Sequence, residues 1–241
     1  TDLYQDIFSD RQARQSLAYA QRLVVLQAHG VQALPAPHRG KARVIYQSTP
    51  ERAPLPRTDR WLRVVMVGHL RAVKSPQTLM EAARQLAGRT DIRIDHIGEA
   101  LAPEWEDAAL ETMLACPGYR WLGPLSHARA RLAIARAHVL VHTSAMEGGA
   151  HVIMEAVRSG TPVLASRVGG NVGMLGAGYD GYFPHGDAAR LAALITRCRD
   201  EQDRTDGLLA RLRGQCDVRA PLFDAEHERA SLLQLLQEIT S

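Results

Sequence analysis

The chain has 241 residues, of which 46% are hydrophobic, and its 29 basic and 26 acidic residues give a formal net charge of +3. This length suits one large globular domain or two small ones. The basic residues are scattered and aromatic residues make up only 5%, which argues against the clustered basic stripe of a nucleic-acid-binding surface.

Membrane and disulfide roles are also disfavoured. No apolar run approaches the roughly 18 to 20 residues that cross a bilayer, and no secretory signal pattern opens the chain. Cys116, Cys198 and Cys216 are odd in number and form no CxxC pair, so we expect thiols in a reducing compartment. The cytoplasm is the expected location. The chain begins with Thr1 and not with Met, and we expect an N-terminal truncation.

The first 50 residues contain too few elements for a complete α/β domain. They predict a helix over 10–21, a strand over 22–27, a short helix over 29–34 and a strand over 42–48. Residues 51–60, ERAPLPRTDR, contain two prolines and no apolar periodicity. This segment predicts a linker or a domain boundary.

From residue 61 onward, short apolar strands alternate with longer helices. The expected strands are 61–68, 92–98, 119–123, 138–144 and 161–166. The expected helices are 74–88, 103–116, 126–137, one beginning near Gly149 or Ala150, and 187–198. This alternation predicts βαβ crossovers and a doubly wound parallel sheet over 61–215.

Single residues mark the expected ends of several of these helices. Ser75, Ser126 and Asp187 are expected as helix caps, Pro76 suits the first position of a helix, and Gly88 suits the end of one. The glycine-rich segment 167–178 is expected to be a loop, and 181–187 an edge segment. An amphipathic pattern over 227–239 predicts a helix at the end of the chain.

Ligands of doubly wound sheets bind outside the carboxyl ends of the strands, and the segment SAMEGGAHVIMEAVRSG lies at such an end. The first amides of the helix that follows can bind an anion. Gly148 and Gly149 allow close approach to the backbone. Glu147 lies in the loop, and Glu155, almost two turns into the helix, can accept hydrogen bonds from a ribose diol. The pattern favours a sugar nucleotide, although carboxylates eight positions apart also occur by chance.

A second group of polar residues follows the strand 61–68. Gly68, His69, Arg71 and Lys74 lie between this strand and the next helix. Lys74 can contact phosphate oxygens as a point charge, and the alternative is a solvated loop lysine. His69 either contacts a ligand in the crevice or has only a structural role.

Other kinds of site have less support. His138, His142 and His151 raise the alternative of a metal centre, but no HExxH motif occurs, and we expect no metal ligands. No GxGxxG motif supports a nicotinamide cofactor, and no GxSxG motif supports acyl transfer.

The segment EGGAHVIME resembles the E-x7-E motif of the GT-B glycosyltransferases of the retaining family 4 type. Its setting is also similar: VGHLRAVKSPQTLMEA, DIRIDHIGEA, YRWLGPL, HVLVHTSAMEGG and SGTPVLAS follow the order of that family's motifs. The resemblance implies an α/β, GT-B-like fold. Residues 1–50 would be the C-terminal part of a Rossmann-like acceptor domain, 51–60 a linker, 61–215 the Rossmann-like donor domain, and 216–241 a helix crossing back.

The resemblance also implies roles for single residues. Lys74 would contact the donor diphosphate, Glu155 the nucleotide ribose, and Glu147 the donor sugar. Catalysis would rest on Glu147, His69 and Lys74. The other donor-binding positions would be Gly68, Gly98, Leu125, Gly148, Gly149, Ala150, His151 and Val152. The UDP-sugar would be a substrate, and neither a cofactor nor a metal is expected.

Three departures from the family pattern are informative. His69 replaces a usual Arg, and Gln47, Ser48 and Thr49 replace a usual N-G-V. Gly149 replaces a usual Phe, which would open space beside the donor sugar. With TDLYQDI, KARVIYQS and GYFPHGD, these departures resemble one subgroup, the selenosugar synthases of selenoneine biosynthesis.

That subgroup implies a reaction of a UDP-hexose, UDP-GlcNAc in the first instance, with selenophosphate to give a selenosugar, UDP and phosphate. His69, Arg71 and His151 would hold the acceptor phosphate. An ordinary UDP- or GDP-hexose transferase to an alcohol, a UDP-sugar epimerase and a nucleotide-sugar-binding module without turnover remain alternatives. The sugar, the stereochemistry and the oligomeric state are left open.

Overall fold

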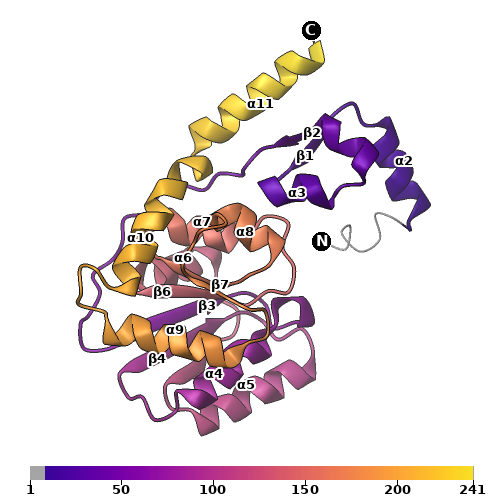
Figure 1. Cartoon of the computed structure of the whole chain (residues 1–241). Helices are drawn as coiled ribbons and strands as arrows, with labels where there is room; N and C mark the ends of the chain where they lie inside the picture. The colour runs from indigo at the N-terminus through magenta and orange to yellow at the C-terminus, as the bar shows by residue number, and fades with distance from the viewer. Residues whose placement is uncertain (1–8, 241) are drawn as a thin grey trace.

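A six-stranded parallel sheet forms the centre of the larger part of the molecule in the computed structural model, which describes residues 9–240 (Figure 1). Its strand order is β5-β4-β3-β6-β7-β8. The strands are β3 (Leu62–Val67), β4 (Ile92–Ile97), β5 (Tyr119–Trp121), β6 (Val139–His142), β7 (Val163–Ser166) and β8 (Tyr182–Phe183). The order reverses between β3 and β6, where a doubly wound sheet offers its ligand crevice. The predicted fold class is confirmed.

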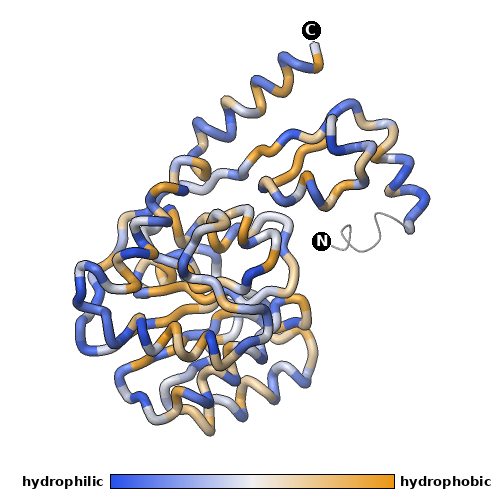
Figure 2. Tube along the Cα trace, viewed as in Figure 1, coloured by the Kyte–Doolittle hydropathy of each residue, from blue (hydrophilic) through white to orange (hydrophobic). Residues whose placement is uncertain are grey.

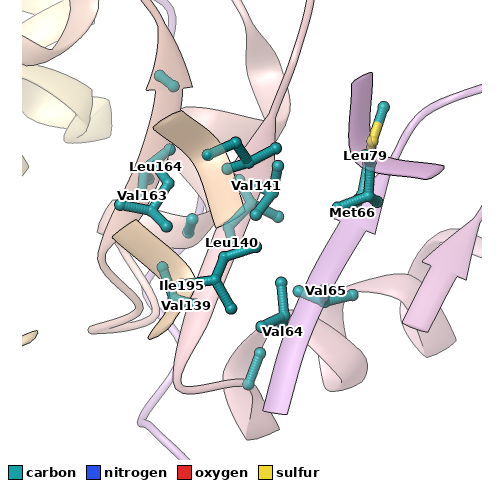
Figure 3. Packing of buried hydrophobic residues seen from close by; sticks show 14 of the residues in the cluster. Val64, Val65, Met66, Leu79, Val139, Leu140, Val141, Val163, Leu164 and Ile195 are labelled. Carbon is teal, nitrogen blue, oxygen red and sulfur yellow. The ribbon is translucent and has the colours of Figure 1, made fainter. Parts of the chain in front are cut away.

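The central strands are buried on both faces because helices cover the sheet from each side. The helices are α4 (Pro76–Gln85), α5 (Pro103–Ala115), α6 (His127–Arg136), α7 (His151–Val157), α8 (Gly169–Leu175), α9 (Ala188–Asp200) and α10 (Leu208–Arg219). Val64, Leu140 and Leu164 are fully buried and lie in one packed cluster (Figure 3). Figure 2 shows hydrophobic segments along these strands, with hydrophilic residues frequent on the outer helices.

The expected caps are confirmed at two positions and wrong at one. The Asp187 carboxylate accepts a hydrogen bond from the Arg190 amide at 2.8 Å, and Ser126 accepts one from the Arg129 amide at 3.5 Å. Ser75 does not cap α4 with its side chain, because its backbone is left-handed (φ 47°) and its hydroxyl contacts His185 instead. Pro76 begins α4 as expected, whereas Gly88 lies beyond the last helical residue, Gln85.

Two helices differ from the sequence prediction. The glycine-rich segment 167–178 contains the helix α8 and is not entirely a loop. A side chain at Gly170 or Gly173 would overlap Glu147 or Gln27, respectively, so these glycines permit close packing against the elements beside α8. The helix α10 was not predicted, and the expected boundary at 215–216 falls inside it.

A small N-terminal unit lies beside the α8 side of the large sheet (Figure 1). It consists of α2 (Arg11–Tyr19), β1 (Leu23–Val25), α3 (Ala28–Ala33), a 3-10 turn η1 (Ala36–Lys41) and β2 (Ala42–Val44). The strands β1 and β2 pair in parallel and are shorter than predicted. The TDLYQDI segment lies outside the described residues.

The last helix connects the two parts of the molecule. The 3-10 turn η3 (Ala220–Phe223) precedes α11 (Ala225–Thr240), which runs from the large unit toward the small one (Figure 1). Glu238 of α11 pairs with Arg43 at 2.7 Å, and Glu228 accepts a hydrogen bond from the Ser48 amide at 2.9 Å. Within residues 9–240, no helix is both long and apolar enough to cross a membrane.

The cap at Asp187 generates a stability prediction. Asp187→Ala should lower the free energy of unfolding by about 1 kcal/mol, because the Arg190 amide loses its partner. Asp187→Asn keeps an acceptor oxygen, and it should change the free energy of unfolding by less than about 0.5 kcal/mol. Urea denaturation of the three proteins measures both differences. Equal losses in the two variants would contradict this role of the carboxylate oxygen.

Candidate functional site

The loops after β3 and β4 meet at the carboxyl edge of the sheet. Gly98 has φ 155°, and a side chain there would overlap the backbone of Gly68. The indole N–H of Trp121 donates to the Gly98 carbonyl at 2.8 Å, and a bridge joins Leu70 to Ala100. These contacts fix the start of the loop that carries Lys74.

A buried polar cluster joins this loop to the one after β6. Glu147 is only 8% exposed. Its Oε1 accepts a hydrogen bond from Lys74 Nζ at 2.6 Å and lies 3.0 Å from His142 Nε2. His142, the last residue of β6, is itself buried. The structure therefore brings the sequence-predicted Glu147 and Lys74 together and adds His142.

The partners of Glu147 determine its charge. Burial by itself would raise the pKa of this carboxyl, but the hydrogen bond and electrostatic interaction with His142, together with Lys74, outweigh burial and lower the pKa to about 2. Glu147 is therefore a carboxylate at neutral pH. A buried ion of this kind is tolerated only where hydrogen-bonding partners replace water.

The second glutamate lies in a separate polar cluster on α7. Glu155 is 4% exposed, and its Oε1 lies 2.6 Å from His127 Nε2. Arg131 Nη1 and His151 Nε2 are more distant, at 3.8 and 3.9 Å. Arg131 is also buried and donates to Thr49 and to the Pro50 carbonyl. Basic side chains on α6 and α7 thus surround Glu155.

The remaining predicted positions spread along the same edge. His69 is exposed, and its Nδ1 accepts a hydrogen bond from the Glu99 amide at 3.2 Å. Arg71 is partly buried. Leu125 and Val152 pack against the core. Gly148 is half-buried in the loop, and Ala150 precedes α7, which begins one residue later than the latest expected start.

The expected space at Gly149 is filled. A Cβ at this position would lie 2.8 Å from the Leu26 Cβ, so the residue that follows β1 packs where the family pattern has a larger side chain. The prediction that Gly149 leaves room beside a sugar is therefore wrong. The replacement of Phe by Gly is compensated by Leu26.

A pocket of about 230 Å³ opens between the N-terminal unit and the loop that carries Glu147. Gln27 and His29 line it from one side, and Glu147 and Gly170 from the other. Among residues 9–240, the three predicted acceptor contacts, His69, Arg71 and His151, do not line this pocket. Sequence reasoning missed Gln27 and His29 because only the fold brings α3 next to α8.

The histidines do not form a metal centre within the part of the chain that the structure describes, where no group of three or more His, Cys, Asp or Glu side chains could hold a metal ion. His138 Nδ1 accepts a hydrogen bond from the Arg63 amide at 2.8 Å, and its Nε2 lies 2.8 Å from the Thr58 carbonyl. His138 therefore ties the linker to β3, whereas His142 and His127 contact the two glutamates.

Comparisons with known proteins agree with this architecture. Residues 48–209 match the family model of the glycosyl transferases group 1. The D-inositol 3-phosphate glycosyltransferase of Corynebacterium glutamicum (strain R) is 31% identical over 159 residues, which cover 59% of this chain and 38% of that protein.

Solved structures share the fold at low sequence identity. Anabaena Alr3699/HepE in complex with UDP and glucose is 19% identical with a TM-score of 0.76, covering 93% of this chain and 65% of that one. A point mutant of S. aureus TarM, in complex with Fondaparinux, alpha-GlcNAc-glycerol and UDP, is 14% identical with a TM-score of 0.75, covering 93% and 46%. The chain thus spans less than two thirds of the length of these relatives.

The lowered pKa of Glu147 predicts a pH dependence of stability. The folded-state pKa of about 2 lies below the ordinary 4.5, so the stabilisation is fully present above pH 4.5 and is lost as the pH falls through 2. The difference in the free energy of unfolding between the parent and Glu147→Gln should therefore shrink as the pH is lowered across this window. Denaturant titrations at a series of pH values measure it. A difference that does not change with pH would contradict the lowered pKa of Glu147.

Proposed function

Since the chain belongs to the glycosyl transferases group 1 family, we propose that it transfers a sugar from a UDP-sugar bound at the carboxyl edge of β3 and β6. The observation that carries this proposal is the pair of buried carboxylates. Glu147 is held by Lys74 and His142, and Glu155 lies on α7 eight residues later. The UDP and glucose named for HepE support a UDP-sugar as the donor.

Each carboxylate has a distinct role in this proposal. Glu155 accepts hydrogen bonds from the ribose diol, since a carboxylate is the usual partner of such a diol in nucleotide-binding folds. Lys74 contacts the diphosphate and stabilises the charge that develops as UDP leaves. Glu147 contacts the hydroxyl groups of the donor sugar and orients its anomeric carbon. Residues 61–215 would then form the donor-binding domain.

The acceptor in this proposal is selenophosphate. Its support is the resemblance of KARVIYQS, VGHLR, MEGGAHVIMEA and GYFPHGD to the selenosugar synthases. Selenium attacks the anomeric carbon of UDP-GlcNAc as the bond from this carbon to the diphosphate oxygen breaks, which releases UDP. Water then cleaves the selenium–phosphorus bond, which gives the selenosugar and phosphate.

This acceptor needs little proton transfer, because its selenium is already ionised. Catalysis would then depend on positioning and on stabilisation of the leaving diphosphate. His69, Arg71 and His151 remain our candidates for the acceptor phosphate. The two histidines have exposed side chains at the edge of the donor site.

The two glutamates should respond differently to substitution. Glu155→Ala should weaken binding of UDP at least about tenfold, because the ribose loses a charged hydrogen-bond acceptor. Glu147→Ala should mainly lower kcat, and UDP affinity should stay near that of the parent. Calorimetric titration with UDP and steady-state kinetics measure the two effects. Two variants that bind UDP-sugar like the parent would refute the site assignment.

A mass-spectrometric product assay tests the reaction. The protein is incubated with UDP-GlcNAc, with and without selenophosphate. We expect a selenosugar and released UDP only when selenophosphate is present. UDP binding without a selenosugar would refute selenophosphate as the acceptor, and alcohol acceptors would then be screened. A changed sugar nucleotide without any acceptor would indicate an epimerase. UDP binding without product from selenophosphate or from any alcohol would indicate a binding module.

A further inference from the structure

We propose that His142 is a positioning residue that fixes the Glu147 carboxylate in the orientation needed to contact the donor sugar; this inference depends on the proposed function. His142 is only 2% exposed, and its Nε2 lies 3.0 Å from Glu147 Oε1. A side chain so deeply buried acts on a substrate through its neighbour. Neither the metal alternative nor the family motif assigns it this role.

The direction of the hydrogen bond follows from the charge of its partner. The lowered pKa of Glu147 keeps this residue ionised, and an ionised carboxylate only accepts hydrogen bonds. His142 must therefore carry a proton on Nε2. This requirement concerns the protein alone, so it can be tested without any substrate.

The arrangement leaves one carboxylate oxygen available. Lys74 Nζ and His142 Nε2 both contact Oε1, and within residues 9–240 no hydrogen bond reaches Oε2. Glu147 also lines the pocket of about 230 Å³. One oxygen is thus anchored to the protein, and the other can accept a hydrogen bond from a sugar hydroxyl group.

Glu147 needs two hydrogen-bond donors because Lys74 also contacts the diphosphate in the proposed function. A diphosphate beside Lys74 competes with Glu147 for the same ammonium group. When Lys74 turns toward the diphosphate, Glu147 would lose its cationic partner while it remains buried, which is unfavourable. His142 still holds Oε1 at that stage, because it extends from the end of a fully buried strand. Such positioning matters, since a shift of about 1 Å can lower turnover about 100-fold.

Three variants separate positioning from a general effect on folding. His142→Leu replaces the donor with an apolar side chain of similar size. His142→Gln keeps an N–H donor. His138→Leu serves as the matched control. His138 is a buried histidine directly before β6, and its ring nitrogens contact the linker and the Arg63 amide and not Glu147.

We expect kcat to fall about 10- to 100-fold in His142→Leu, with the Kd for UDP within about twofold of the parent value. His142→Gln should recover most of the lost turnover. His138→Leu should lower the midpoint of thermal unfolding and leave kcat nearly unchanged. In ¹⁵N spectra of the histidine-labelled parent, His142 Nε2 should be protonated at neutral pH.

The proposal fails if His142 is protonated only on Nδ1, or if His142→Leu turns over like an active parent. It also fails if the Leu and Gln variants are equally impaired while both remain folded. If the parent neither binds UDP nor forms product, the proposed function is refuted. The positioning role of His142 then fails as well, even if its Nε2 is protonated. The spectra and the parent titration thus distinguish the two failures.

Discussion

The ion pair between Lys74 and Glu147 joins two loops that are far apart in the sequence, and the candidate site depends on it. The loops follow β3 and β6, the neighbouring strands at which the strand order reverses. Because Glu147 is buried, its charge requires partners, and His142 and Lys74 provide them at 3.0 and 2.6 Å. The same contacts that stabilise the carboxylate also fix its direction.

Close packing between the two units of the molecule surrounds this pair. Leu26 fills the space beside Gly149, and Gln27 lies against Gly173 of α8. The glycines of the loop and of α8 therefore allow the N-terminal unit to pack close to Glu147. The residues that line the pocket between them come from both units.

Much of the fold follows from local sequence patterns, and much of the site does not. The alternation of apolar strands and helices over 61–198 predicts the parallel sheet, and Asp187 marks the start of α9 as expected. The helix α8 was missed because its glycines have low helix propensity, and packing against α3 compensates for this.

The two glutamates and Lys74 could be recognised from their places after strands, because the carboxyl ends of parallel strands share one edge. The histidines that contact the two glutamates could not be recognised in this way. The sequence pattern offers His142 only as a candidate metal ligand. His127 lies 28 positions before Glu155, and only the packing of α6 against α7 brings the two side chains to 2.6 Å. Leu26 likewise reaches Gly149 across more than a hundred residues.

A crystal structure of this chain with UDP would show directly whether Lys74 and Glu155 bind the nucleotide. We expect the diphosphate to lie within hydrogen-bonding distance of Lys74 Nζ and the ribose hydroxyl groups to contact the Glu155 carboxylate. His127 should then have moved away from Glu155 Oε1 or share this oxygen with the ribose. A nucleotide bound elsewhere, in contact with neither Lys74 nor Glu155, would refute this donor site.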